Sequence, residues 1–150
     1  MANCKYTLPE DLLRKLSTIV NRMDSISEVV LEEGGEVVLD KVKSNLRGVL
    51  SGKSSGELIS SLGISKVRLD RNGNHNIKIG FREPRKDGKT NAMVANIIEY
   101  GKHNQPARPF LKRAKSQSKK RCIEVMTNKL KEELNKTWTF YLNLIQYFQV

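Results

Sequence analysis

Few residues in this chain have the type and spacing that chemistry at a site requires. His75 follows a predicted turn and His103 lies in a proline-flanked bend, and no histidine or cysteine stands at ligand spacing beside either one. A zinc site needs several such ligands, so none is predicted. Cys4 and Cys122 are far apart in the chain, and two cysteines form neither a disulfide framework nor a complete metal site. We interpret both as free thiols in a reducing cytoplasm.

A nucleophile or a general base is equally hard to find. Cys122 has apolar and basic neighbours, which suits an activated thiol or, as we prefer, a buried structural cysteine. Glu99 precedes Tyr100 and Gly101, and is either a lone general base or, in the interpretation we favour, a carboxylate held by hydrogen bonds in a turn. The loop GKSSGE lacks the spacing of a phosphate-binding loop. We therefore predict no catalytic, cofactor-binding or metal-binding residue, and no enzymatic activity.

The strongest local signal is a bend that joins an apolar segment to a basic one. Gly101 supplies the backbone freedom of a sharp exit, and Pro109 fixes its own φ and disfavours helical geometry in the residue before it. A helix should therefore start at or just after Pro109. Tyr100 and Phe110 flank the bend, and burial of such a ring contributes ~1.5–3 kcal/mol. We expect both rings to pin the turn to the core.

The positive charge of the chain is concentrated beyond this bend. Residues 1–50 carry 7 basic and 8 acidic side chains, residues 51–100 carry 9 and 5, and residues 101–150 carry 11 and 3, which together give the net charge of +11. Such a surface suits nucleic acid, an acidic protein, anionic lipid or a solvated helix face. The candidate contact residues for nucleic acid or an acidic partner are Lys112, Arg113, Lys115, Lys119, Lys120 and Arg121.

Length and composition favour a single domain with a small core. A chain of 150 residues with 38% hydrophobic and 6% aromatic content has little to bury, and some of its apolar surface should be completed by partners. No charged-then-apolar signal stands at the N-terminus, and no apolar run reaches the ~20 residues of a membrane span. We expect a soluble protein with no membrane partner.

The first half of the chain predicts a long helix followed by a hairpin. Thr7 and Glu10 resemble a capping box, and apolar residues then recur at helical spacing to about Leu50. Gly34-Gly35 interrupts this stripe, which indicates either a kink or close packing. A short turn around Leu58, Ile59 and Leu62 precedes two alternating runs that flank an Asn-Gly turn, and this hairpin should cover one face of the first helix.

The stretch after the hairpin predicts a contact loop and an element of uncertain type. Residues 82–90 are charged and have almost nothing to bury, so Arg82, Arg85, Lys86 and Lys89 are interface candidates. Residues 92–100 are apolar and are read as a short helix or a third strand.

The C-terminal third predicts a second long helix from Phe110 to about Leu134, and then a different kind of segment. Residues 137–150 have no side-chain charge and hold five of the nine aromatic residues. An aromatic surface of this kind usually contacts another chain, although it can also pack on the core of its own chain. We divide the chain into a domain at 1–136 and an aromatic contact segment at 137–150, with the interface candidates Trp138, Phe140, Tyr141, Tyr147 and Phe148.

The predicted elements give an α+β fold in which the long N-terminal helix and the C-terminal helix pack on a small antiparallel sheet containing a hairpin. Their order is matched by short motifs: Ser-Gly-x-Leu-x-x-Ser at 55–61, Ile-Glu-Tyr-Gly at 98–101 and Ala-Arg-Pro-Phe-Leu at 107–111. Over residues 8–135 this order resembles the neck or minor-tail protein family of long-tailed bacteriophages. The residues expected to shape the fold are Gly56, Leu58, Tyr100, Gly101, Pro109 and Phe110.

The resemblance implies a structural virion protein of the head–tail junction or tail end, or its relative in a prophage or a phage-tail-like particle. Such proteins form rings, often sixfold, between head-completion proteins and tail-terminator or tail-tube proteins, around a lumen through which DNA passes. It also implies location in the virion after assembly in the host bacterial cytoplasm, without a cofactor. The alternative from the charge pattern is a basic nucleic-acid-binding protein that uses the face of its C-terminal helix.

Overall fold

The computed structural model describes residues 10–50, 56–83, 88 and 90–147 of the 150-residue chain. The predicted cap at Thr7, the thiol of Cys4, the first residue of the motif at 55–61, and the interface candidates Arg85, Lys86, Lys89 and Phe148 lie outside these residues. The elements in chain order are α1 (Glu10–Val49), α2 (Glu57–Ser61), β1 (Leu62–Ile64), β2 (Arg68–Leu69), β3 (His75–Asn76), β4 (Ile79–Phe81), α3 (Asn91–Tyr100) and α4 (Leu111–Tyr147).

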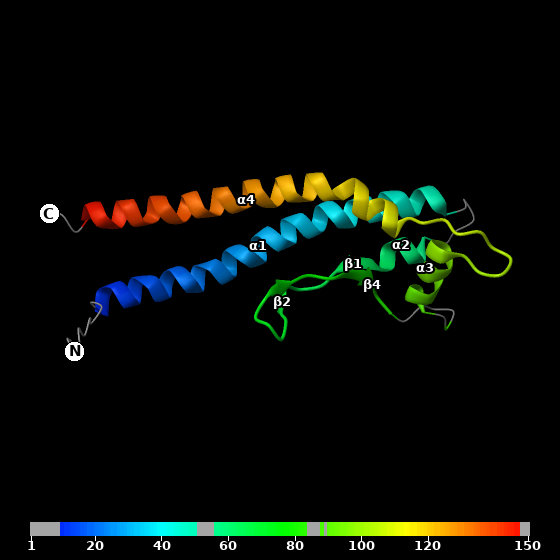
Figure 1. Ribbon diagram of the computed structural model, residues 1–150, viewed down its shortest axis with the longest axis horizontal. Helices are drawn as coiled ribbons and strands as arrows, with labels where there is room; N and C mark the ends of the chain where they lie inside the picture. The colour runs from blue at the N-terminus through cyan, green and yellow to red at the C-terminus, as the bar shows by residue number, and fades with distance from the viewer. Residues whose placement is uncertain (1–9, 51–55, 84–87, 89, 148–150) are drawn as a thin grey trace, which may run out of the picture.

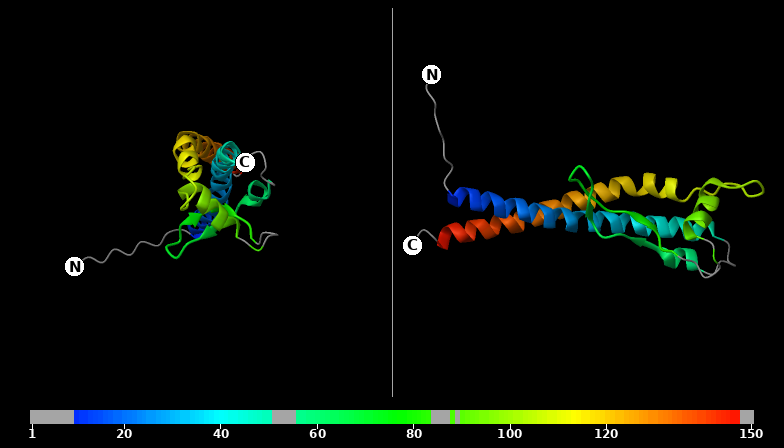
Figure 2. Two further views of the ribbon diagram at one scale, coloured as in Figure 1. Left: turned by 90° about the vertical axis from the view of Figure 1, so that its right-hand side faces the viewer. Right: turned by 90° about the horizontal axis from the view of Figure 1, so that it is seen from below.

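Two long helices, α1 and α4, form the frame of the molecule. They lie side by side and run in opposite directions, so that the start of α1 and the end of α4 lie at one end of the frame (Figures 1 and 2). The short helices α2 and α3 pack near the other end, and the strands lie along α1. The predicted α+β fold, with two helices and a small antiparallel sheet containing a hairpin, is confirmed.

The core lies where the two long helices meet the short elements. Phe110 is 0% exposed, as expected, and packs in one cluster with residues from α1, α2, α3 and α4. Leu58 is also buried there, and Gly56 adopts a left-handed φ of 72° as the N-cap of α2. The buried residues of this cluster are Val42, Leu46, Leu58, Leu62, Ala95, Ile98, Phe110 and Ala114.

The two adjacent glycines of α1 let different elements approach the helix. Helix α1 continues through Gly34 and Gly35, so close packing is what accounts for them. A Cβ built on Gly34 would lie 2.5 Å from the Cγ atom of Met126 in α4. A Cβ on Gly35 would collide instead with the side chain of Ile64 in β1. The pair therefore marks the point at which α1 is held between α4 and the sheet.

The predicted hairpin is confirmed, but it forms as two short ladders. Strand β1 pairs antiparallel with β4, and β2 pairs antiparallel with β3 across the turn at residues 70–74. Between the ladders, the Ser65 amide donates to the Lys78 carbonyl at 2.8 Å, and the Lys78 amide donates to the Ser65 hydroxyl at 3.0 Å. This side-chain bond replaces one rung of a regular ladder, and the sheet stays connected along its length.

The segment read as a helix or a strand is helix α3. Its N-cap is Thr90, whose hydroxyl accepts a hydrogen bond from the Met93 amide at 3.1 Å. The expectation that Tyr100 pins the bend to the core is wrong, because its side chain is 77% exposed. In α3 the buried residues include Asn91 and Ile98. Tyr100 follows Asn91 by nine residues, about two and a half turns, and therefore faces the opposite side.

Helix α4 starts directly after the bend, as predicted, and is longer than its apolar spacing suggested. It runs without a break through residue 136 to Tyr147, so most of the aromatic segment continues the same helix. The proposed domain boundary therefore coincides with no end of an element. No helix within the described ranges is both long and apolar enough to cross a membrane.

Helix propensity and packing make opposite predictions at two glycines of α1. A Cβ on Gly48 meets nothing within 4 Å, so Gly48→Ala should stabilise the fold by about 0.5–1 kcal/mol. Gly34→Ala gains the same propensity but forces Met126 away from α1, so its free energy of unfolding should fall below that of Gly48→Ala. Urea unfolding followed by circular dichroism measures both. Equal stabilisation by the two changes would contradict the close approach of α1 and α4.

Candidate functional site

The bend between α3 and α4 is organised around one buried carboxylate. Glu99 is 4% exposed, and its Oε2 atom accepts hydrogen bonds from the amides of Phe110 at 2.7 Å and Leu111 at 2.8 Å. Its Oε1 atom accepts a third from the Lys112 amide at 3.0 Å. These amides begin α4 and have no acceptor within the helix, and the positive end of the helix dipole favours an anion beside them. Glu99 is therefore a structural cap, which confirms the interpretation as a turn carboxylate.

The rest of the bend fixes the other helix ends. Gly101 has a φ of 79°, and a Cβ there would lie 2.7 Å from the Gln105 carbonyl oxygen, so only glycine fits. The Arg108 amide donates to the Ile98 carbonyl at 2.8 Å, and its guanidinium donates to the Val49 carbonyl at 3.2 Å. The bend thus secures the end of α1, the end of α3 and the start of α4 together.

Cys122 is a packing residue of the α1–α4 contact. Its Sγ atom donates to the Gly34 carbonyl at 3.4 Å and lies 3.6 Å from the Sδ atom of Met126. Burial raises the pKa of the Cys122 thiol. Because the thiolate is the reactive form, the thiol has low reactivity at neutral pH. The interpretation as a structural cysteine is confirmed, but Cys122 is half-buried and not buried as expected.

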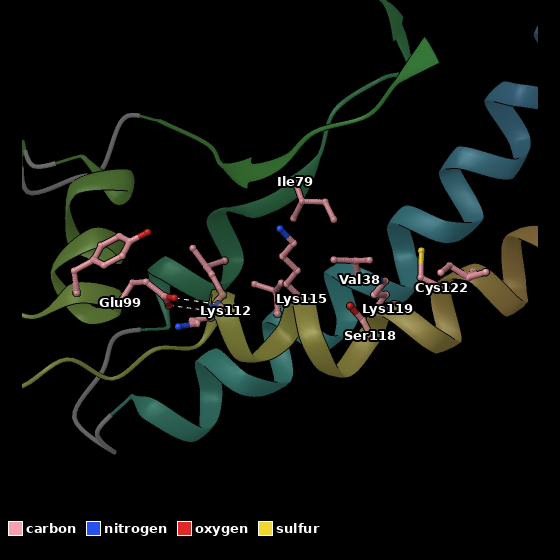
Figure 3. Close-up of a pocket in the computed structure, with 12 residues that line it drawn as sticks. Val38, Ile79, Glu99, Lys112, Lys115, Ser118, Lys119 and Cys122 are labelled. Atoms are coloured by element: carbon pink, nitrogen blue, oxygen red, sulfur yellow. Dashed lines mark hydrogen bonds between the residues drawn. The ribbon is translucent and has the colours of Figure 1, made fainter. Parts of the chain in front are cut away.

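An open groove of about 750 Å³ lies beside α4. Its floor is apolar and includes Val38 and Val42 from α1 and Ile79 from β4. Lys112, Lys115 and Lys119 of α4 also line it, and Figure 3 shows Lys115 rising from α4 toward Ile79. We call this feature the lysine groove.

The predicted basic residues divide between the groove and the rest of α4. All six side chains are exposed, but only Lys112, Lys115 and Lys119 line the groove. The other three, Arg113, Lys120 and Arg121, do not line it, and Arg121 lies 3.7 Å from Glu124. Arg82 is exposed and lies beside Gly63 of β1. The sequence therefore located the charge, but it did not reveal that part of this charge surrounds an apolar floor.

The floor residues went unnoticed because they look like ordinary core positions. Val38 and Val42 continue the apolar stripe of the first helix, and Ile79 alternates with polar residues as any hairpin residue does. Only the packing of α1, β4 and α4 leaves them at the base of a groove. Two exposed apolar side chains, Tyr100 and Ile123, also line the groove.

The aromatic interface candidates cannot be assigned to a surface in the same way. Trp138, Phe140, Tyr141 and Tyr147 lie on the described backbone of α4, whereas their side chains lie outside the described part of the structure. For metal binding, no cluster of three or more histidine, cysteine or acidic residues occurs among the described residues. His75 contacts Asp24 at 3.7 Å, and His103 is exposed in the bend.

Removing the charge of the Glu99 cap should destabilise the fold. In Glu99→Gln one oxygen becomes an amide donor that faces backbone donors, so the free energy of unfolding should fall by about 1–3 kcal/mol. Urea unfolding measures the loss, and hydrogen exchange should quicken at Phe110 and Leu111. The matched control is Glu36→Gln on the exposed face of α1, with an expected change within about 0.5 kcal/mol. A Glu99→Gln chain as stable as this control would refute the cap.

The raised pKa of Cys122 predicts slow alkylation of the folded chain. In a Cys4→Ser background, iodoacetamide should modify Cys122 more slowly in the folded state than in urea at neutral pH. The rate should then climb as the pH rises above the ordinary range of a thiol, because the thiolate forms only there. Mass spectrometry of timed samples follows the reaction. Equal rates for folded and unfolded chains at neutral pH would contradict the packing of the half-buried thiol against Gly34 and Met126.

Comparison with known proteins gives one family. The family described as "Bacteriophage HK97-gp10, putative tail-component" matches residues 10–101, which is more than half of the chain. The match includes α1, the hairpin, α3 and Gly101, and it ends before α4. Neither a curated protein nor a solved structure matches the chain.

Proposed function

The chain belongs to the HK97-gp10-like family of phage tail components, and we propose that it is a virion subunit that assembles as a ring and joins neighbouring rings. Family membership makes it a structural protein of the bacteriophage tail, and it suggests a role without catalysis. The position we propose is the head–tail junction or the tail end, in a phage, a prophage or a phage-tail-like particle.

The observation that carries this proposal is apolar surface left uncovered on the helical frame. Val20 is 61% exposed on α1, and Met23 is exposed near it. Both belong to the apolar stripe predicted for the first helix, and in the isolated subunit both are exposed. Leu130 and Leu134 are likewise exposed on α4. Apolar side chains arranged along two long helices favour burial against other subunits.

We infer the partners from the family and from the charged and aromatic segments of the chain. The subunit would contact copies of itself in a ring of six, head-completion proteins on one side and tail-terminator or tail-tube proteins on the other. The charged loop that contains Arg82, Arg85, Lys86 and Lys89 and the aromatic segment are the proposed contacts to these neighbours. Phage DNA would pass through the lumen.

A nucleic-acid-binding role is the second candidate, and one observation favours it. Seven basic residues and no acidic residue lie between Arg108 and Arg121. A phosphate backbone needs an exposed, polar and basic track. Three of these lysines instead surround an apolar floor, which suits a protein partner better.

The direct test of the proposed role is loss of the gene in the phage or prophage that encodes the chain. We expect heads and tails to accumulate unjoined, or tails of defective ends, and electron microscopy counts them. The chain itself should be found by mass spectrometry in purified wild-type particles. Normal particles without the chain would refute the proposal.

Removing the aromatic segment tests its proposed contact role. A chain that stops after Lys136 keeps the described core but loses the last turns of α4, so it should assemble less well while circular dichroism still reports a helical protein. Negative-stain electron microscopy of the purified protein compares the two chains. If the shortened chain forms rings as readily as the full chain, the segment is not an interface.

A further inference from the structure

We propose that the lysine groove of one subunit receives the acidic face of helix α1 from a neighbouring copy. This inference rests on the proposed function, because it assumes that copies of the chain join one another, and it names the surfaces that meet. The groove of one copy and the acidic face of the next copy would be the two surfaces of one contact that repeats between copies.

The acidic face of α1 is an uninterrupted line of charge. Between Asp24 and Asp40 the chain has six acidic residues and no basic one. Five of the six recur at every fourth position, and all five are exposed. Each step of four turns the row by about 40°, so it winds gradually around α1, and its last three members share one side of the helix. The five are Asp24, Glu28, Glu32, Glu36 and Asp40.

Most of this acidic line has no ion-pair partner among the described residues. His75 lies near Asp24 at 3.7 Å. Within the described residues, no ion pair involves Glu32, Glu36 or Asp40. Carboxylates lined up in this way repel one another and gain when a cationic surface approaches. A basic surface on another molecule would therefore fit them.

The lysine groove has the matching charge and spacing. Lys112, Lys115 and Lys119 follow one another at intervals of three and four residues, so they line one side of α4. At a rise of about 1.5 Å per residue, Lys112 and Lys119 are about 10 Å apart along α4, and Glu32 and Asp40 are about 12 Å apart along α1. The two rows have similar lengths and can face one another.

Apolar contacts would accompany the charges. Val29 is exposed next to the acidic residues of α1. Ile123 is 56% exposed and Tyr100 is more exposed still, and both line the groove. An exposed tyrosine beside an apolar floor is a common anchor of a protein interface, whereas it gives nothing to the isolated fold. A helix from a neighbouring copy can cover the apolar floor of the groove and pair its carboxylates with the lysines along the rim.

The two surfaces lie on opposite sides of one subunit. Val38 points into the groove, and Glu36 and Asp40 are each two residues from it along α1. Two residues turn a helix by about 200°, so these carboxylates point about 160° away from the groove. A subunit therefore cannot fill its own groove with this face. Contacts between different surfaces of identical copies run head to tail, and they close into a ring when the rotation between copies permits.

Charge reversal at the groove tests the contact. In the full-length chain, Lys115→Glu with Lys119→Glu should weaken self-association by roughly tenfold or more in analytical ultracentrifugation at low salt. The control Arg113→Glu with Lys120→Glu changes the charge equally, on the same helix but outside the groove, and should leave association within about twofold. Equal weakening by both pairs would overturn the proposal. Circular dichroism checks that each variant is folded.

The reciprocal change sharpens the test. Glu36→Lys with Asp40→Lys should also weaken association, and a chain that carries all four reversals should recover it, because both surfaces have exchanged sign. The groove-reversed and face-reversed chains, each weak alone, should associate when mixed. A folded four-fold variant that stays as weak as the two-fold variants would overturn the contact.

The remaining outcomes separate this contact from the proposed function and from nucleic-acid binding. Rings that persist in every variant would overturn the contact and leave the tail role standing. A chain missing from purified particles would refute the tail role, while association that follows the charge swaps would still support the contact. Binding of a short DNA duplex that falls equally in the groove pair and the control pair, with self-association unchanged in both, would overturn the contact in favour of nucleic acid.

Discussion

The structure depends on the capture of three backbone amides by one buried carboxylate. Glu99 lies in the last turn of α3 and caps the first turn of α4. Its hydrogen bonds to the amides of Phe110, Leu111 and Lys112 set the direction in which α4 leaves the bend. Because α4 is long, a small change in that direction would move its far end considerably. Phe110, beside the carboxylate, is also the most deeply buried ring of the described core. One joint therefore fixes both the frame and the core.

The frame positions charge for contacts with other molecules. Where α1 and α4 face each other, Gly34 of α1 leaves room for the side chains of Met126 and Cys122 of α4. Their other sides carry acidic residues on α1 and basic residues on α4. Since the main core cluster lies toward the end where the short helices pack, several apolar residues along the frame stay exposed within the described subunit. A tail component that is completed by neighbours accounts for this distribution.

Much of the fold could be predicted from local patterns. Helical spacing, the Asn-Gly turn and the proline-flanked bend gave both long helices, the hairpin and the start of α4, because each is decided by residues close in sequence. The exposure of Tyr100 could not be predicted, since it depends on the helical phase of a segment that also suited a strand. The groove floor was equally hidden, because Val38 and Ile79 meet only through packing of distant elements.

The most direct measurement is zero-length carbodiimide cross-linking of an equal mixture of ¹⁴N and ¹⁵N chains, read by mass spectrometry. We expect peptides that join Lys115 or Lys119 of one isotope to Glu36 or Asp40 of the other, since the two surfaces face away from each other within a subunit. Finding these links only within one isotope, or finding no link between the two surfaces in assembled protein, would contradict the account.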